Sequence, residues 1–217
     1  MALQHWIYWE IASQPFLEKE ISLALFFLAA IVAVSLLSFS KGRTWFDALA
    51  LHPYSVVHRG KWYMLLTSGF LHADLNHLFF NVFSYFFFAS ALEQIVGAEA
   101  FAVIFLGSVV LSDIPSVLKY KDDPAYRSLG ASGGVSGVIF SYILYDPLSK
   151  IYLFLIPIGI PAAVFAVLYL AYSFYASERG MDNINHSAHF WGAMVGVLLT
   201  VVQNPSVLQI FWSQLWY

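Results

Sequence analysis

The stretch Gly130-Ala131-Ser132-Gly133 opens one long apolar segment, and the pair Ala188-His189 opens another further along the chain. A serine framed by glycines and a histidine are the residue types of a nucleophile and its base. Polar side chains at membrane depth are costly, so by default they indicate a functional site. The rest of the sequence decides whether the starts of these two segments can meet.

The composition predicts an integral membrane protein. Of the 217 residues, 60% are hydrophobic, 18% are aromatic and only 11% are charged, whereas a soluble domain carries about 25% charged residues. The formal charge of -3 comes with no basic stripe, which predicts no nucleic-acid partner. Cysteine is absent, and this excludes disulfides, thiol nucleophiles and thiolate metal sites.

Six apolar segments are long enough to predict six membrane-spanning helices, since a span needs about 20 mostly apolar residues. They cover residues 21–39, 77–96, 100–118, 131–145, 151–175 and 188–202. The fifth is interrupted by Pro157, Gly159 and Pro161. We expect an all-α membrane protein whose six-helix domain covers residues 21–203.

Three other segments complete the predicted organisation. Residues 1–20 form an N-terminal segment whose acidic residues are not typical of a signal peptide. Residues 40–76 are apolar in pieces but carry four Lys or Arg residues, which predicts an interfacial amphipathic first loop. Residues 204–217 form a C-terminal segment whose Trp and Tyr residues are expected to anchor it at the interface.

The order of the segments places four polar side chains at similar depth. His77 and Asn81 begin the second predicted helix, Ser132 begins the fourth and His189 begins the sixth. With six spans, the even-numbered helices all begin at the same membrane face. The four side chains are therefore expected near one face.

Two pairs of glycines predict which helices meet. Gly133 and Gly137 are four residues apart, as are Gly192 and Gly196. Small residues at this spacing let helix backbones approach closely. This favours contact between the fourth and sixth helices, although generic small-residue packing is the alternative interpretation.

The same residues suggest acyl transfer. A serine hydroxyl needs a base within about 2.6–3.2 Å, and no carboxylate adjoins His189, so we predict a Ser132–His189 dyad. His77 and Asn81 share one helical face and are candidate donors to an oxyanion. Ser136, one turn deeper, is a rival nucleophile. His72 is expected at the interface rather than in the site.

The chain resembles the rhomboid intramembrane serine proteases over roughly residues 62–196. The resemblance rests on three motifs that occur in order. They are His77-Leu78-Phe79-Phe80-Asn81, Gly130-Ala131-Ser132-Gly133, and Ala188-His189 followed by Gly192 and Gly196. This chain departs from the family pattern in the first loop. There the family commonly has an aromatic pair followed by Arg, and this chain has Trp62-Tyr63-Met64.

The resemblance implies an all-α, six-transmembrane-helix bundle that cleaves transmembrane segments of other membrane proteins. It implies Ser132 as nucleophile, His189 as general base, His77 and Asn81 as oxyanion-stabilising groups, and Gly130 as a backbone contact to substrate. It also implies no metal and no cofactor. The partners expected are transmembrane protein substrates and the lipid bilayer, in a multi-pass protein of the cell (inner) membrane.

Orientation is a point of conflict. Rhomboid proteins usually hold their N-terminus in the cytoplasm and the mouth of the site outside. Lys and Arg residues, however, number 2 on the N-terminal side and 8 on the mouth side of the predicted spans, and the positive-inside rule then turns the mouth toward the cytoplasm. The sequence leaves both orientations open.

A second function class is a non-catalytic rhomboid-like protein that binds or sorts transmembrane clients. Retention of Ser132, His189, His77 and Asn81 favours the enzyme. A small transporter is less consistent with the sequence, because no inverted repeat is evident and the polar residues lie near one face.

Overall fold

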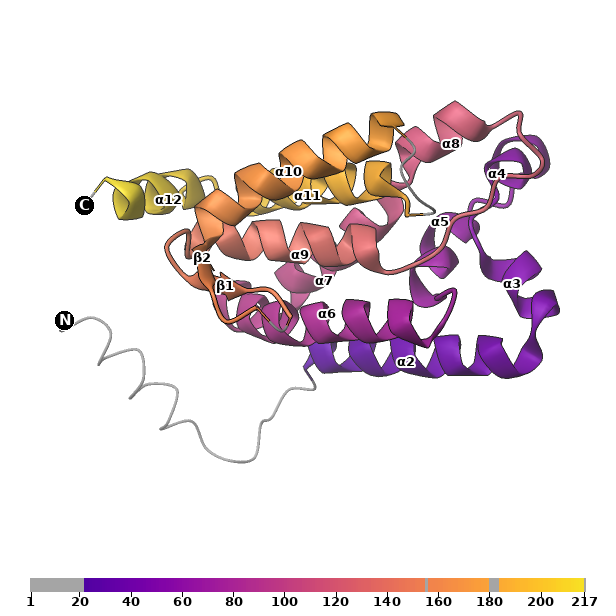
Figure 1. The fold of residues 1–217 in the computed structure, drawn as a ribbon, viewed down its shortest axis with the longest axis horizontal. Helices are drawn as coiled ribbons and strands as arrows, with labels where there is room; N and C mark the ends of the chain where they lie inside the picture. The colour runs from indigo at the N-terminus through magenta and orange to yellow at the C-terminus, as the bar shows by residue number, and fades with distance from the viewer. Residues whose placement is uncertain (1–21, 155, 180–183, 217) are drawn as a thin grey trace.

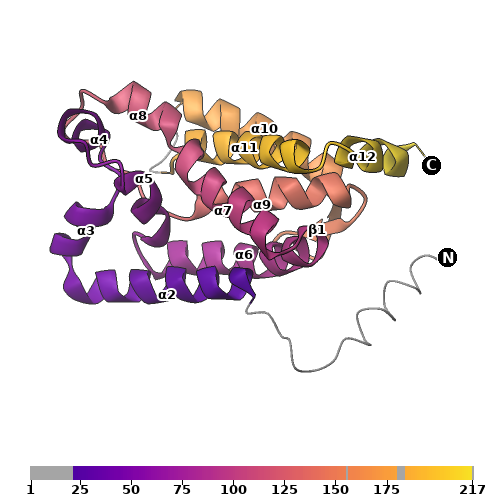
Figure 2. The same cartoon turned by 180° about the vertical axis from the view of Figure 1, so that it is seen from behind.

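The structure is a computed structural model that describes residues 22–154, 156–179 and 184–216, and most of these are helical (Figure 1). The N-terminal segment predicted at residues 1–20 lies outside the described residues. The long helices lie side by side in one bundle (Figures 1 and 2). These helices are α2 (Leu23–Lys41), α6 (Leu75–Val96), α7 (Ala98–Ser112), α9 (Ser132–Tyr145), α10 (Ala162–Arg179) and α11 (His186–Gln203).

Short elements cover the two ends of this bundle. One end carries the helices of the first loop and the continuation of α7 (Figure 1). These are α3 (Arg43–Leu49), α4 (Pro53–Arg59), α5 (Met64–Thr67), the 3₁₀ helix η1 (Ser68–Phe70) and α8 (Ile114–Tyr120). The other end carries a two-stranded antiparallel sheet of β1 (Lys150–Tyr152) and β2 (Gly159–Pro161), and α12 (Val207–Leu215) projects beyond it.

Helix α9 is the centre of the bundle. Eleven of its 14 residues are buried, and it packs against α6, α7 and α11. The prediction that glycines bring α9 and α11 together is confirmed. A Cβ atom added at Gly192 would lie 2.1 Å from the carbonyl oxygen of Gly133, and one at Gly196 would lie 2.2 Å from that of Gly137. The two backbones therefore touch without side chains between them.

Hydroxyl groups extend this contact toward the end of α9. The Ser141 hydroxyl lies 2.8 Å from the Gly137 carbonyl oxygen and 3.1 Å from that of Gly196, and Thr200 donates to Ser141 at 2.8 Å. In a membrane, where the apolar surroundings drive helix association only weakly, close backbone packing and interhelical hydrogen bonds supply the attraction.

Membrane-spanning length is reached by fewer helices than the sequence predicts. Among the described residues, α2, α6 and the α7–α8 stretch Ala98–Tyr120 are long and apolar enough to span a membrane. A fourth span is reached only if α11 and α12 count together, and these two helices meet at 111°. Helix α9 has 14 residues and is therefore about 21 Å long. This is shorter than the hydrocarbon layer of a membrane, which is about 30 Å thick.

The fifth predicted span, residues 151–175, is wrong at its start. Strands β1 and β2 pair there instead, with Ile151 opposite Ile160, and helix α10 begins only at Ala162. The physical reason lies in Pro157, Gly159 and Pro161, since proline cannot donate a helical hydrogen bond and glycine disfavours the helix. The expectation of an all-α membrane protein agrees with the mostly helical structure, to which this hairpin adds two three-residue strands.

A carboxylate from α6 caps the start of α2. Glu93 accepts hydrogen bonds from the backbone N–H of Leu23 at 2.7 Å and of Ala24 at 3.3 Å, and also from the Ser22 hydroxyl. An anion suits the N-terminal end of a helix because unpaired N–H groups and the helix dipole meet there. This contact ties the first long helix of the bundle to the second.

We expect Gly192→Ala to lower the free energy of unfolding by about 3 kcal/mol or more, because the new methyl group would meet the backbone of α9. Gly107→Ala is the matched control. Its methyl group would meet only the flexible end of Leu199, so we expect little change. Denaturant titration of both variants in detergent micelles measures the difference, and equal stability would contradict the proposed backbone contact.

Candidate active site

The five residues singled out from the sequence line one cavity of about 670 Å³. The cavity lies where α6, α9 and α11 begin, at the end of the bundle near α5 and α8 (Figure 1). His77 and Asn81 come from α6, Gly130 and Ser132 from the loop before α9 and its first turn, and His189 from α11. Three helix starts that are far apart in the sequence thus share one site.

Ser132 and His189 are held by the contact between their helices. Ser132 is the first residue of α9, and His189 lies in the first turn of α11. Both side chains are half-buried. The ring of Tyr169, from α10, stacks on the His189 imidazole with 6.3 Å between centroids. The orientation of His189 is therefore restricted from the α10 side.

His77 and Asn81 occupy one face of the first turns of α6. Asp74 caps this helix by accepting a hydrogen bond from the His77 backbone N–H at 2.8 Å. The Asn81 amide donates to the His77 carbonyl oxygen at 3.0 Å, and its side chain is buried. Both residues line the cavity.

Gly130 lies in a backbone conformation that only glycine tolerates well. Its φ is +126°, and an added Cβ would lie 2.8 Å from Cε1 of His77. Its N–H donates to the Ser68 carbonyl oxygen at 3.0 Å. The glycine therefore allows the loop before Ser132 to pass directly beneath the His77 ring.

His72 is a brace for the same loop and was not identified from the sequence. It is buried rather than interfacial, with its side chain only 2% exposed. Nε2 accepts a hydrogen bond from the Ala131 N–H at 3.5 Å, and Nδ1 lies 2.9 Å from the Ser35 hydroxyl. Since Ser35 itself donates to the Phe70 carbonyl oxygen, Nδ1 of His72 carries the proton. The ring connects α2 to the residue before Ser132.

Asn185 is a second residue that the sequence did not identify. Its Oδ1 accepts from the Ala188 N–H at 3.1 Å and so caps α11. Its Nδ2 lies 3.1 Å from the Ser116 hydroxyl, 3.1 Å from the Ser128 hydroxyl and 3.5 Å from Oδ1 of Asp113. One amide thus connects the start of α11 to the α7–α8 junction and to the loop before α9.

The rival nucleophile Ser136 lies in a different environment. Its hydroxyl is buried and lies 2.6 Å from the hydroxyl of Tyr169. It is not among the described residues that line the cavity. Within the same described part of the chain, no three His, Asp or Glu side chains are grouped as a metal site would require.

Comparisons with known proteins agree on one family. The sequence profile of the Rhomboid domain matches residues 59–205. The rhomboid protein YdcA of Bacillus subtilis (strain 168) is 33% identical over 179 residues, which cover 80% of this chain and 85% of YdcA. Rhomboid protease GluP of the same organism is 32% identical over 142 residues, which cover 65% of this chain and 26% of GluP. Mitochondrial Rhomboid protein 1 of Saccharomyces cerevisiae is 30% identical over 139 residues, which cover 62% of this chain and 40% of that protein.

The His72 brace predicts that acid destabilises the fold. His72 lies outside the candidate spans, and burial lowers its pKa from 6.5 to about 3, with a smaller contribution from His77. Below pH 6.5 the unfolded chain therefore binds a proton that the folded chain excludes. Stability is complete above pH 6.5 and falls as the pH drops toward 3, by at most about 1.4 kcal/mol per pH unit.

We expect His72→Gln to flatten this slope between pH 6.5 and 5, since a neutral amide does not titrate. His58→Gln, which replaces an exposed histidine of the first loop, is the control and should retain the wild-type slope. Unfolding free energies measured at several pH values give the slopes. A wild-type slope in His72→Gln would show that other groups carry the acid sensitivity.

Proposed function

This chain belongs to the rhomboid family, and we propose that it is an intramembrane serine endopeptidase that cleaves transmembrane segments of other membrane proteins. The observation that carries the proposal is the single cavity that Ser132, His189, His77, Asn81 and Gly130 line together. No cofactor, metal or nucleic acid takes part in the proposed reaction.

In the proposed mechanism, the Ser132 hydroxyl attacks the carbonyl carbon of the scissile peptide bond. His189 accepts the hydroxyl proton as the new C–O bond forms and then gives it to the leaving amine. Water hydrolyses the resulting acyl-enzyme with His189 again as base, which restores Ser132. The restricted setting of His189, stacked on Tyr169, supports its role as the base.

His77 and Asn81 are proposed to stabilise the oxyanion of each tetrahedral intermediate. Both face the cavity from α6, and the cap by Asp74 supports a fixed position for the first turn of that helix. The backbone of Gly130 is proposed to contact the substrate, and its position on the wall of the same cavity supports this role.

We propose that six helices cross the membrane, namely α2, α6, α7 with α8, α9, α10 and α11, within a domain of residues 21–203. Helices α9, α10 and α11 do not meet the criterion of length and apolarity singly, but all three pack within the bundle, α9 against α6 and α7, α11 against α9 and α7, and α10 against α11. The first-loop helices would lie at the interface on the mouth side, and α12 at the opposite interface. The membrane is proposed to be the cell (inner) membrane.

The nucleophile is tested by labelling with a fluorophosphonate, which reacts with activated serines. We expect Ser132→Ala to abolish labelling of the purified protein in detergent. Ser136→Ala is the matched control and should retain labelling, because the Ser136 hydroxyl is hydrogen-bonded to Tyr169 away from the cavity. Thermal unfolding confirms that both variants are folded.

Loss of labelling in Ser136→Ala alone would overturn the assignment of the nucleophile. A folded wild type that neither labels nor cleaves any transmembrane substrate would favour the non-catalytic alternative, in which the protein binds or sorts transmembrane clients.

Asn81→Ala is expected to slow cleavage of a transmembrane substrate about 10²-fold or more through kcat, because one oxyanion donor is lost. The α6 backbone should remain helical, since the Asn81 side chain donates only to a carbonyl oxygen of its own helix. Turnover kinetics combined with a thermal unfolding control measure the effect. Unchanged kcat would remove Asn81 from the oxyanion role.

A further inference from the structure

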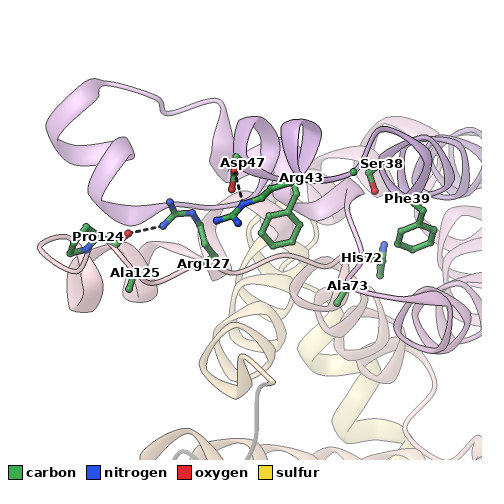
Figure 3. Close-up of a pocket in the computed structure, with 11 residues that line it drawn as sticks. Ser38, Phe39, Arg43, Asp47, His72, Ala73, Pro124, Ala125 and Arg127 are labelled. Atoms are coloured by element: carbon green, nitrogen blue, oxygen red, sulfur yellow. Dashed lines mark hydrogen bonds and ion pairs between the residues drawn. The ribbon is translucent and has the colours of Figure 1, made fainter.

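A second cavity, of about 590 Å³, lies beside the proposed active site (Figure 3). It is an open cavity lined by the end of α2, the helix α3, the residues before α6 and the loop before α9. The residues that line it and matter here are Phe39, Arg43, Phe46, Asp47, His72 and Arg127. Phe46 and Arg127 also line the active-site cavity, so the two cavities adjoin.

Two guanidinium groups from different segments meet at this cavity. Figure 3 shows Arg43 of α3 and Arg127 of the loop before α9 on the wall of the same cavity, with Arg43 joined to Asp47 and Arg127 directed at the Pro124 carbonyl oxygen. Two cations turned toward one space repel each other unless an anion lies between them. Guanidinium groups match the geometry of phosphate oxygens with paired N–H donors.

Arg127 is the stronger of the two anchors. Its Nη1 donates to the carbonyl oxygens of Pro124 at 3.0 Å and Tyr126 at 2.9 Å, which fix the guanidinium plane. The side chain is half-buried, and among the described residues no carboxylate forms an ion pair with it. Arg43 is exposed and pairs with Asp47 at 3.4 Å, a contact that surface solvent weakens.

The cavity wall also carries apolar side chains beside the two arginines, so the cavity suits an amphiphilic ligand. Helix α2 is a candidate membrane span that ends at Lys41, two residues before Arg43. Phe39, in its last turn, is exposed and lines the cavity, and Leu36 and Leu37 beside it are exposed as well. The guanidinium groups therefore lie at the end of a lipid-facing apolar surface, which is the depth of phospholipid headgroups.

We propose that this cavity binds the phosphate of an anionic phospholipid headgroup, with Arg127 and Arg43 as the donors and the lipid chain along Phe39. Burial keeps His72 neutral by lowering its pKa to about 3, so the two arginines supply the positive charge, and Asp47 is the one acidic side chain among the described residues that line the cavity. A bound lipid would adjoin the active-site cavity through Phe46 and Arg127. The proposal rests on the membrane fold and not on proteolysis, so its test does not use activity.

Native mass spectrometry of the full chain in detergent tests this site. Phosphatidylglycerol is the probe, and phosphatidylcholine with the same acyl chains and inorganic phosphate are the comparison ligands. We expect phosphatidylglycerol to bind most tightly. We expect Arg127→Gln to weaken its binding about tenfold or more, the loss typical of a charge-assisted hydrogen bond, and Arg43→Gln to weaken it to a smaller extent.

Lys121→Gln is the matched control. It removes an exposed cation from the same loop, outside the residues that line the cavity, and should leave phosphatidylglycerol binding unchanged. If Arg127→Gln does not fold, Arg43→Gln replaces it in the test. Arg43 is exposed, so this variant is expected to fold, and its binding of phosphatidylglycerol can be compared with that of Lys121→Gln. Equal binding in the arginine and lysine variants would overturn the site. Equal affinity for phosphatidylcholine, or displacement of the lipid by an equal concentration of inorganic phosphate, would overturn the assignment to an anionic lipid.

Discussion

The direct contact between the backbones of α9 and α11 is the constraint on which the rest of the structure depends. Gly192 and Gly196 approach the carbonyl oxygens of Gly133 and Gly137 so closely that no side chain fits between them. This contact fixes the distance between the helix that begins at Ser132 and the helix that carries His189. Ser132 and His189 lie in the first turns of these two helices. A shift of one helix relative to the other would therefore change the distance between the two residues.

The loop before α9 is the second feature that defines the site, and its partners come from the first loop. Ser128 pairs with Leu51 through two backbone hydrogen bonds, Gly130 donates to the Ser68 carbonyl oxygen, and Ala131 donates to His72. Three of the four residues before Ser132 thus have a hydrogen-bond partner in the first loop. The first loop is therefore part of the construction of the site, although none of its helices carries a proposed catalytic group.

The length of the apolar segments predicts where most of the helices lie, and the glycine spacing predicts the contact between α9 and α11. The order of the segments predicts that the polar residues lie near one end of the bundle. Each of these signals can be recognised in the sequence without knowing which residues are in contact. The sequence does not predict the hairpin before α10, where the apolar pattern continues through Pro157 and Pro161 while the backbone cannot remain helical. It also misses His72 and Asn185. The sequence places His72 at the interface and gives Asn185 no role in the site, because their roles depend on partners, such as Ser35 and Asp113, that are far away in the chain.

The position of His189 on α11 also has a consequence for biosynthesis. Every other helix of the bundle precedes α11 in the chain. While the ribosome is still translating the residues before α11, the inserted part of the molecule contains Ser132 but neither His189 nor the glycine face that packs against α9. The nascent protein therefore remains in the membrane, among its neighbours, without the His189 of the proposed dyad. Translation order delays assembly of the site until the last helix of the bundle is in place.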